Sequence, residues 1–197
     1  MIEIGDVKNI EPFQKFLNLY KIATLAGQKN IEAACLGTVS RDNNPHSRFI
    51  NIKYINKDEF VFFSNYLSAK GEHIKHNNKV SLVFYWNLAH IQIRLEGSVS
   101  KLSDKRSDLH WNKRLDSKNA LAIASKQSSK SISYEDVLNN YNNCIDNKDL
   151  SERPDYWGGY IINPIYFEFW KGDKNRINER EVFELDGFDW RNYLLQP

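Results

Sequence analysis

The stretch Ile91-Gln92-Ile93-Arg94-Leu95-Glu96 alternates apolar and polar side chains. Because successive side chains of a strand point to opposite faces, this pattern predicts a strand with one buried and one solvated face, continuing to Leu102. A second apolar run at 80–86 comes directly before it. The two segments together predict an antiparallel sheet that is covered on one side only.

The chain on either side of this stretch continues the same pattern. Apolar runs separated by turn residues predict further strands at 31–40, 47–55 and 59–65, the first two forming a hairpin through the turn at 41–45. Apolar residues at helical spacing predict helices at 11–27, 68–77, 103–125 and 134–141, with a polar loop at 142–154. Alternation returns at 157–195, interrupted by turns at 172–175 and 186–187, and predicts three or four closing antiparallel strands. Short strands joined by hairpins, with helices inserted between them, predict a mainly β fold with helices (α+β) built on an antiparallel barrel.

The composition fits one globular domain over residues 1–197. A chain of 197 residues that is 41% apolar can bury a sizeable core. Its 27 basic and 25 acidic residues give a net charge of only +2. We therefore expect neither nucleic acid nor an anionic membrane as a partner, and any basic site must be local.

The cysteines and histidines indicate a reducing compartment and no metal site. Cys35 and Cys144 have no partners at metal-ligand spacing, so two unpaired thiols are expected. His73 and His76 lie three apart on an expected helix without a third ligand, as on a solvated helix face. Neither an apolar run of ~20 residues nor a basic start followed by an apolar run occurs, which predicts a cytoplasmic protein.

Three blocks of sequence carry the functional signal. The first two are Arg48-Phe49-Ile50-Asn51-Ile52-Lys53 and Ser64-Asn65-Tyr66-Leu67-Ser68-Ala69-Lys70-Gly71. The third combines Trp157-Gly158-Gly159-Tyr160, Phe167-Glu168-Phe169-Trp170 and Arg176-Ile177-Asn178-Glu179-Arg180. Aromatic residues, paired glycines and arginines four apart suit a flat anionic ligand. In this order and at these separations the blocks resemble the pyridoxamine 5'-phosphate oxidase family of flavin mononucleotide (FMN) enzymes, over about residues 11–197.

The resemblance implies an FMN-binding split β-barrel that forms a homodimer, with the flavin at the subunit interface. It implies oxidation of pyridoxamine or pyridoxine 5'-phosphate to pyridoxal 5'-phosphate, with O2 as the acceptor and H2O2 as the product. Two alternatives stay open. A related FMN oxidase could act on another planar anionic substrate, such as a phenazine precursor, and a non-catalytic protein could simply hold the flavin.

The cofactor residues follow from the same resemblance. They are expected to be Arg48, Phe49, Ile50, Asn51, Ile52, Lys53, Phe63, Ser64, Lys70, Gln92, Gln127, Ser128, Trp170 and Arg180. Arg48 and Lys53 would point to opposite faces of a regular strand, so a bulge or backbone contacts must reconcile them. The start of a helix with Lys70 nearby attracts phosphate. Ala69 stands where the family usually has an arginine, which predicts weaker FMN binding.

The substrate side departs further from the family. The resemblance implies substrate contacts from Lys53, His110, Arg114, Lys118, Arg176 and Asn178, and assigns catalytic roles to Arg176 and Asn178. His110 replaces a tyrosine of the family, Lys118 a serine and Asn178 a histidine. The arm that covers the substrate in typical members is short here. The motifs therefore support the flavin site better than the pyridoxamine phosphate site.

Overall fold

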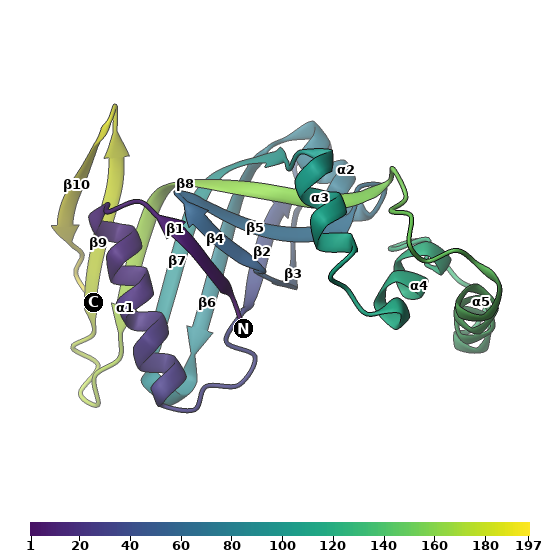
Figure 1. Cartoon of the computed structure of the whole chain (residues 1–197). Coiled ribbons are helices and arrows are strands. Elements are labelled where there is room, and N and C mark those ends of the chain that lie inside the picture. Colours follow the sequence, from purple (N-terminus) through teal and green to yellow (C-terminus); the bar gives the residue numbers. More distant parts are fainter.

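The computed structural model describes residues 1–197, and all of its strands join one sheet (Figure 1). The sheet follows the order β1-β4-β5-β8-β7-β6-β2-β3, and β9 pairs with β8 and with β10. The strands are β1 (Glu3–Val7), β2 (Ala33–Val39), β3 (Pro45–Asn51), β4 (Tyr54–Lys57), β5 (Glu59–Asn65), β6 (Lys79–Trp86), β7 (Ile91–Lys101), β8 (Trp157–Lys171), β9 (Glu179–Asp186) and β10 (Asp189–Leu194). The expected class, mainly β with helices, is confirmed.

Strand β7 behaves as its alternation predicts. Ile91, Ile93 and Leu95 are buried, whereas the polar residues between them face outward. Across the ladder Ile93 lies opposite Phe84 of β6 and Phe169 of β8. The apolar face of these three strands forms the centre of the core.

Helix α1 (Glu11–Leu25) covers that apolar face. Its Phe13 and Phe16 are each only 1% exposed. Phe13 packs edge-on against Phe167 with ring centroids 5.2 Å apart, and Phe16 packs in the same way against Phe84 at 5.3 Å. Edge-to-face aromatic pairs of this kind add to the free energy of burial.

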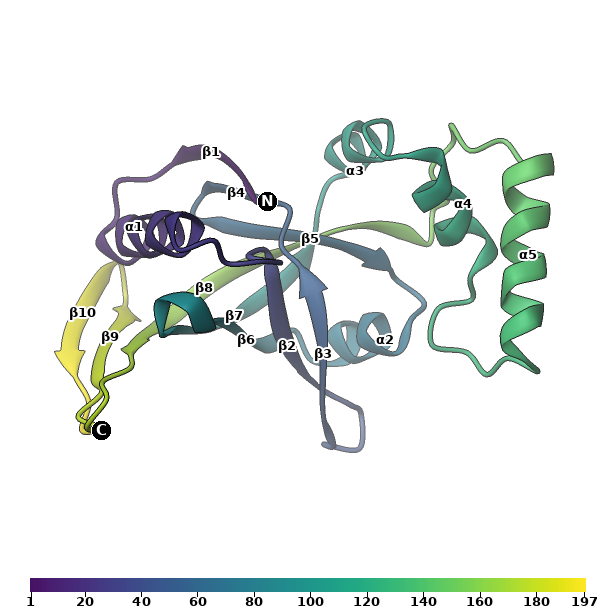
Figure 2. The same ribbon diagram turned by 90° about the horizontal axis from the view of Figure 1, so that it is seen from below.

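The remaining helices lie toward one end of the molecule. They are α2 (Ala69–His76), α3 (Asp104–Trp111), α4 (Asp116–Ala124) and α5 (Tyr134–Asn147). The 3-10 turn η1 (Asn87–Ala89), which links β6 to β7, lies apart from them near α1. Figure 2 shows α3, α4 and α5 at the end opposite the β9–β10 hairpin and the C-terminus, with β8 extending between the two ends. None of the helices combines the length and apolarity needed to span a bilayer.

Two predicted elements are each divided in two. The helix expected at 103–125 ends at Trp111 and restarts at Asp116, because Leu115 adopts extended backbone and caps α4. The strand expected at 47–55 changes partners. The Ile52 N–H donates to Glu32, whereas the Lys53 N–H donates to Val61, so β3 and β4 belong to different parts of the sheet.

Three further expectations need correction. Helix α5 continues to Asn147, so the loop predicted at 142–154 is wrong over its first six residues. Strand β1 was not predicted, because its sequence Glu-Ile-Gly-Asp-Val is short and acidic. It runs parallel to β4, so the sheet is not wholly antiparallel. The three closing strands β8, β9 and β10 are antiparallel, as predicted.

Candidate functional site

A cluster of basic side chains gathers where β4 begins and α3 ends. Lys53 lies in the link between β3 and β4, Arg114 in the link between α3 and α4, and Lys118 on α4. The Arg114 guanidinium lies 4.3 Å from the Trp157 ring and donates to Asn119 Oδ1 at 2.9 Å and to the Lys118 carbonyl at 2.6 Å. Burial lowers the pKa of Arg114 to about 10, which keeps the group charged at neutral pH. These contacts fix a cation at one position.

The basic side chains also influence one another. Burial lowers the pKa of Lys53; Glu32 opposes this shift, while the charges of Lys118 and Arg114 add to it. Burial likewise lowers the pKa of His110 to about 4, reinforced by Arg114, Lys53, Lys113 and Lys118. Cations this close favour a bound anion, because it would relieve their mutual repulsion. The structure thus brings together four of the predicted substrate residues, namely Lys53, His110, Arg114 and Lys118.

A second cation lies buried at the start of α2. Ser68 caps this helix by accepting from the Gly71 N–H. Lys70 is 8% exposed, and its Nζ donates to Ser64 Oγ at 3.0 Å, Ser68 Oγ at 3.1 Å and Gln127 Oε1 at 3.2 Å. Burial, together with the charge of Arg48, lowers the pKa of Lys70 to about 8. All three acceptors are neutral, so the ammonium has no negative partner among them, and a buried charge of this kind calls for one.

Arg114, Lys118 and two of the residues bonded to Lys70 line the same hollow. This cavity of about 230 Å³ has Ser64, Gln127, Arg114 and Lys118 in its lining. Phe63 and Trp157 form part of its aromatic wall, with ring centroids 5.5 Å apart. Predicted cofactor residues and predicted substrate residues therefore share one cavity.

The block at 48–53 is only partly directed outward. Arg48 donates from Nη1 to the Leu36 carbonyl at 3.1 Å and to Thr38 Oγ1 at 2.6 Å. Phe49 is 78% exposed and Asn51 is also exposed, whereas Ile50 is half-buried. Ile52 is fully buried in the core, so only its backbone could meet a ligand. The break between β3 and β4 frees Lys53 from strand alternation, which removes the conflict expected between Arg48 and Lys53.

Five other predicted residues, all except Ser128, lie at the far end of β8. Gln92, Trp170 and Arg180 are neighbours on β7, β8 and β9. Arg176 and Asn178 belong to the turn between β8 and β9, where Arg176 is exposed with φ 63° and Asn178 Oδ1 accepts from the Asp173 N–H at 3.1 Å. Ser128 is exposed with φ 72° in the link after α4, next to Gln127 and thus near the basic cluster.

The length of β8 shows how far the residues at the cavity lie from the group of Gln92, Trp170 and Arg180. Gly158 pairs with Ser64 of the cavity, and Trp170 is twelve residues farther along the same strand. At ~3.3 Å per residue this is a path of about 40 Å. Figure 1 shows β8 reaching from the α3 side toward the β9–β10 hairpin. One chain therefore does not bring its two groups of predicted cofactor residues together.

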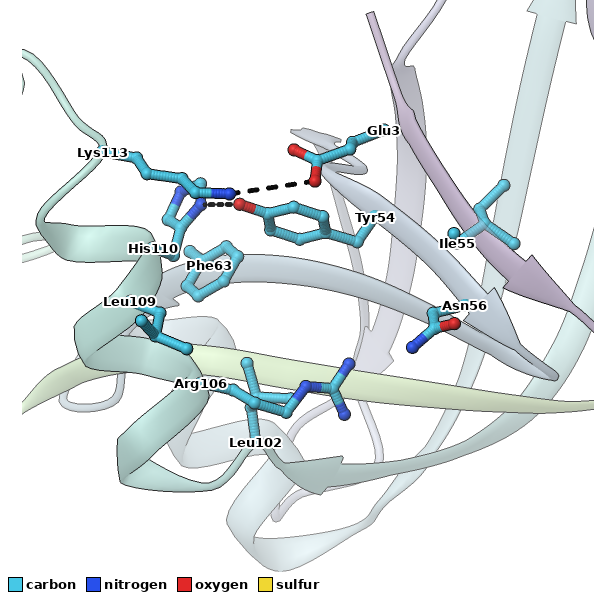
Figure 3. A pocket seen from close by; sticks show the side chains of 11 residues that line it. Glu3, Tyr54, Ile55, Asn56, Phe63, Leu102, Arg106, Leu109, His110 and Lys113 are labelled. Carbon is cyan, nitrogen blue, oxygen red and sulfur yellow. Dashed lines mark hydrogen bonds and ion pairs between the residues drawn. The ribbon is translucent and has the colours of Figure 1, made fainter.

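Sequence reasoning missed Tyr54, which the structure places against the basic cluster. Its hydroxyl lies 2.7 Å from His110 Nδ1, and both residues line a second cavity of about 240 Å³ (Figure 3). Phe63, expected as a cofactor residue, stacks on the His110 ring at a centroid distance of 3.7 Å. The only signal for Tyr54 was its place directly after Lys53, because no spacing relates it to a histidine 56 residues away.

The fold and the cation-lined cavity define a split-barrel protein that is equipped for an anionic ligand, and comparison with known proteins gives the family. Residues 22–139 match the family model for pyridoxamine 5'-phosphate oxidase, and residues 157–197 match that for the pyridoxine 5'-phosphate oxidase C-terminal dimerisation region. The chain belongs to the pyridoxamine 5'-phosphate oxidase family, as its motifs predicted, and this family is one of oxidoreductases.

Individual relatives agree with this assignment. A pyridoxine/pyridoxamine 5'-phosphate oxidase from Colwellia psychrerythraea is 38% identical over 96% of this chain and 88% of its own. The pyridoxine-5'-phosphate oxidase of Bos taurus is 35% identical over 89% of this chain and 68% of its own. The crystal structure of PhzG from Burkholderia lata, in complex with tetrahydrophenazine-1-carboxylic acid, superposes with a TM-score of 0.90 at 26% identity, covering 94% of this chain and 92% of PhzG.

Proposed function

We propose that this protein is an FMN-dependent oxidase that converts pyridoxamine or pyridoxine 5'-phosphate into pyridoxal 5'-phosphate, with O2 as the acceptor and H2O2 as the product. One observation carries the proposal. The cavity of about 230 Å³ is lined jointly by the Lys70-bonded residues Ser64 and Gln127 and by the basic residues Arg114 and Lys118. Two cations in the lining of this hollow, and a third bonded to that lining, suit a phosphate-bearing cofactor beside a phosphate-bearing substrate.

The residues present fit FMN. Lys70 is a buried cation bonded only to neutral groups, and it stands at the start of a helix, where a terminal monophosphate is favoured. Ser64, Lys70 and Arg48 would hold that phosphate, and Gln127 with Ser128 would meet the flavin. When bound, FMN supplies a two-electron acceptor. The residues contribute binding and orientation, and Ala69, which carries no charge, leaves one phosphate contact fewer than the family has.

The same proposal includes a homodimer with shared sites. The cavity at one end of β8 and the group of Gln92, Trp170 and Arg180 at the other lie about 40 Å apart along the strand, too far for one FMN to touch both. A second copy would supply its hairpin end to the first copy's cavity. The match of residues 157–197 to a dimerisation region supports this arrangement.

Substrate binding in this proposal relies on charge and stacking. Lys53, Arg114 and Lys118 would hold the substrate phosphate, with His110 as a neutral donor. Arg176 and Asn178 of the second copy would face the reacting end of the substrate and orient it. Fixing a planar substrate in this way converts binding energy into correct alignment of the reacting carbon. The cytoplasmic location stays a prediction from the sequence.

One observation favours a second candidate, a related FMN oxidase that acts on another planar anion. PhzG, whose structure superposes with a TM-score of 0.90, was crystallised with tetrahydrophenazine-1-carboxylic acid. A carboxylate would satisfy the same cations as a phosphate. His110, Lys118 and Asn178, which replace the residues typical of the family, are the positions where such a preference would arise.

A turnover assay separates the two candidates. The FMN-loaded protein is supplied with pyridoxamine 5'-phosphate, pyridoxine 5'-phosphate or a reduced phenazine carboxylate, and H2O2 release is followed. We expect measurable oxidation of a phosphorylated vitamer. Activity with the phenazine carboxylate alone would replace the first candidate by the second, and FMN binding without oxidation of any of the three would leave a flavin-binding protein.

A further inference from the structure

Tyr54 and His110 form a contact that none of the proposed roles above uses. Tyr54 opens β4 and His110 lies in the last turn of α3, yet the phenol oxygen is 2.7 Å from His110 Nδ1 (Figure 3). The Phe63 ring stacks on the imidazole, with centroids 3.7 Å apart and planes inclined by 11°. Phe63 fixes the plane of the imidazole ring, and Tyr54 fixes the orientation of the ring within that plane.

The protonation states of the pair follow from their surroundings. Burial and the nearby Glu3 raise the pKa of Tyr54, so the phenol keeps its proton at neutral pH and can donate it. Burial and the surrounding cations Arg114, Lys53, Lys113 and Lys118 hold the pKa of His110 at about 4, so the imidazole is neutral. A neutral imidazole that accepts at Nδ1 carries its proton on Nε2.

We propose, building on the function proposed above, that Tyr54 is a positioning residue whose hydroxyl holds His110 in the tautomer with the proton on Nε2, which then donates to the oxyanion of the substrate. Nδ1 is occupied by Tyr54, so Nε2 is the ring nitrogen left for a ligand. The opposite tautomer would present a lone pair to an anion and repel it. The Nε2–H of His110 would thus add an uncharged donor beside the cations Arg114, Lys53 and Lys118.

The tautomer is measured directly by nitrogen NMR of the full, FMN-loaded protein with labelled histidine. The His110 signals are assigned by their loss in His110→Gln. We expect the wild-type ring in the Nε2–H form, and a mixture of both tautomers in Tyr54→Phe. Inorganic phosphate, used as the probe, should shift the Nε2 signal of the wild-type protein. A ring in the Nδ1–H form, or one unchanged by Tyr54→Phe, would overturn the proposal.

A double-mutant cycle tests whether Tyr54 acts through His110. Loss of one neutral hydrogen bond should weaken phosphate affinity and raise KM roughly threefold to tenfold in Tyr54→Phe, with kcat and FMN affinity unchanged. In the His110→Ala background, Tyr54→Phe should change neither the phosphate affinity nor KM. An equal weakening in that background would mean that Tyr54 acts by packing alone.

Tyr134→Phe is the matched control, because Tyr134 is 77% exposed on α5, and it should leave both values unchanged. The NMR measurement and the double-mutant cycle also test this proposal separately from the proposed function. If the protein oxidises neither vitamer, the oxidase assignment fails, while the tautomer and the phosphate affinity still decide the role of Tyr54.

Discussion

Arg114 and Arg180, at opposite ends of β8, are held by opposite kinds of partner. At the cavity end, Arg114 donates to an amide oxygen and a carbonyl and stacks on Trp157. At the hairpin end, Arg180 Nε donates to Glu168 Oε1 at 2.8 Å and Arg94 Nη1 donates to Glu168 Oε2 at 2.7 Å. Glu168 is 2% exposed, and no comparable carboxylate is bonded to Arg114.

The charges at the hairpin end are paired within the structure, whereas those at the cavity end are free to pair with a ligand. A buried carboxylate between two arginines is neutralised within the chain and fixes three adjacent strands. Cations bonded to neutral groups stay available for an outside anion. In the proposed dimer, the hairpin end would therefore provide a rigid surface with Trp170 and Gln92, and the cavity end would provide most of the anion affinity.

The largest expected effect lies at the hairpin end, in Glu168→Gln. Burial would raise the pKa of Glu168, but the hydrogen bond and charges of Arg180 and Arg94 outweigh it and hold the pKa below its ordinary value of 4.5. Loss of the carboxylate should lower the free energy of unfolding by about 3 kcal/mol, measured by urea unfolding. Glu179→Gln, exposed on the neighbouring strand β9, should change it by less than ~0.5 kcal/mol.

The same pair has a pH signature. Because the folded pKa of Glu168 is depressed, its contribution to stability is present above its ordinary pKa and is lost as the pH falls through the folded pKa. The wild-type protein should lose more stability than Glu168→Gln over that acid window. Identical acid curves for the two proteins would show that this end does not depend on its ion pairs.

The next effect is expected at the cavity end, in Arg114→Ala. Removal of a charged donor to the substrate anion should cost about 1.5–3 kcal/mol, which lowers kcat/KM for the phosphorylated vitamer about 10- to 150-fold. Lys105→Ala, exposed on α3, should leave kcat/KM unchanged. FMN affinity measured on both variants shows whether the fold is intact, and full activity in Arg114→Ala would remove this arginine from the site.

Much of the fold could be predicted because its signals are local. The alternation of β7 and the apolar spacing of α1 each describe one element that buries one face, and both elements formed as predicted. The break at Leu115 and the change of partner at Ile52 depend on contacts with distant strands and helices, which no local pattern contains. Strand β1 was missed for the same reason, since its pairing with β4 rather than its own sequence defines it.

Some residues of the candidate site could likewise be predicted from the sequence, and others could not. Lys53, Arg114 and Lys118 were found by their resemblance to a family motif, and the structure gathers them at one cavity wall or beside it. Tyr54 belongs to no such motif, and its contact with His110 joins β4 to α3. The separation of Ser64 from Trp170 was also invisible, because sequence distance does not tell which end of a strand a residue occupies.

The next expected effect is on FMN affinity, through the buried charge of Lys70. Lys70→Met keeps the buried volume but removes the charge, so FMN affinity should fall by about 1.5–3 kcal/mol, measured by quenching of flavin fluorescence. Lys75→Met, exposed on the same helix, is the control and should bind FMN normally. Unchanged affinity in Lys70→Met would mean that the lysine serves only the packing of α2.

Lys70 also predicts how FMN affinity depends on pH. Its pKa is lowered to about 8, so the ammonium is charged below this value and loses its proton above it. Since the phosphate prefers the charged form, affinity should decline as the pH rises beyond about 8, by at most ~tenfold per unit. This decline should disappear in Lys70→Met, and a decline that persists there would assign the titration to another group.

The smallest effect is expected from Asn178→His at the hairpin end. Asn178 cannot ionise near neutral pH as a histidine can, and its Oδ1 is already engaged by the Asp173 N–H at 3.1 Å. If the residue orients the substrate, histidine should raise kcat/KM for pyridoxamine 5'-phosphate, and a tenfold gain corresponds to ~1.4 kcal/mol of transition-state stabilisation. Loss of the turn contact should lower stability by only about 1 kcal/mol, so unfolding and turnover are measured on the same samples. A wild-type protein that binds FMN fully but oxidises neither vitamer, together with an Asn178→His variant that restores no turnover, would contradict the vitamin B6 assignment and leave the hairpin end as a surface for a different planar anion.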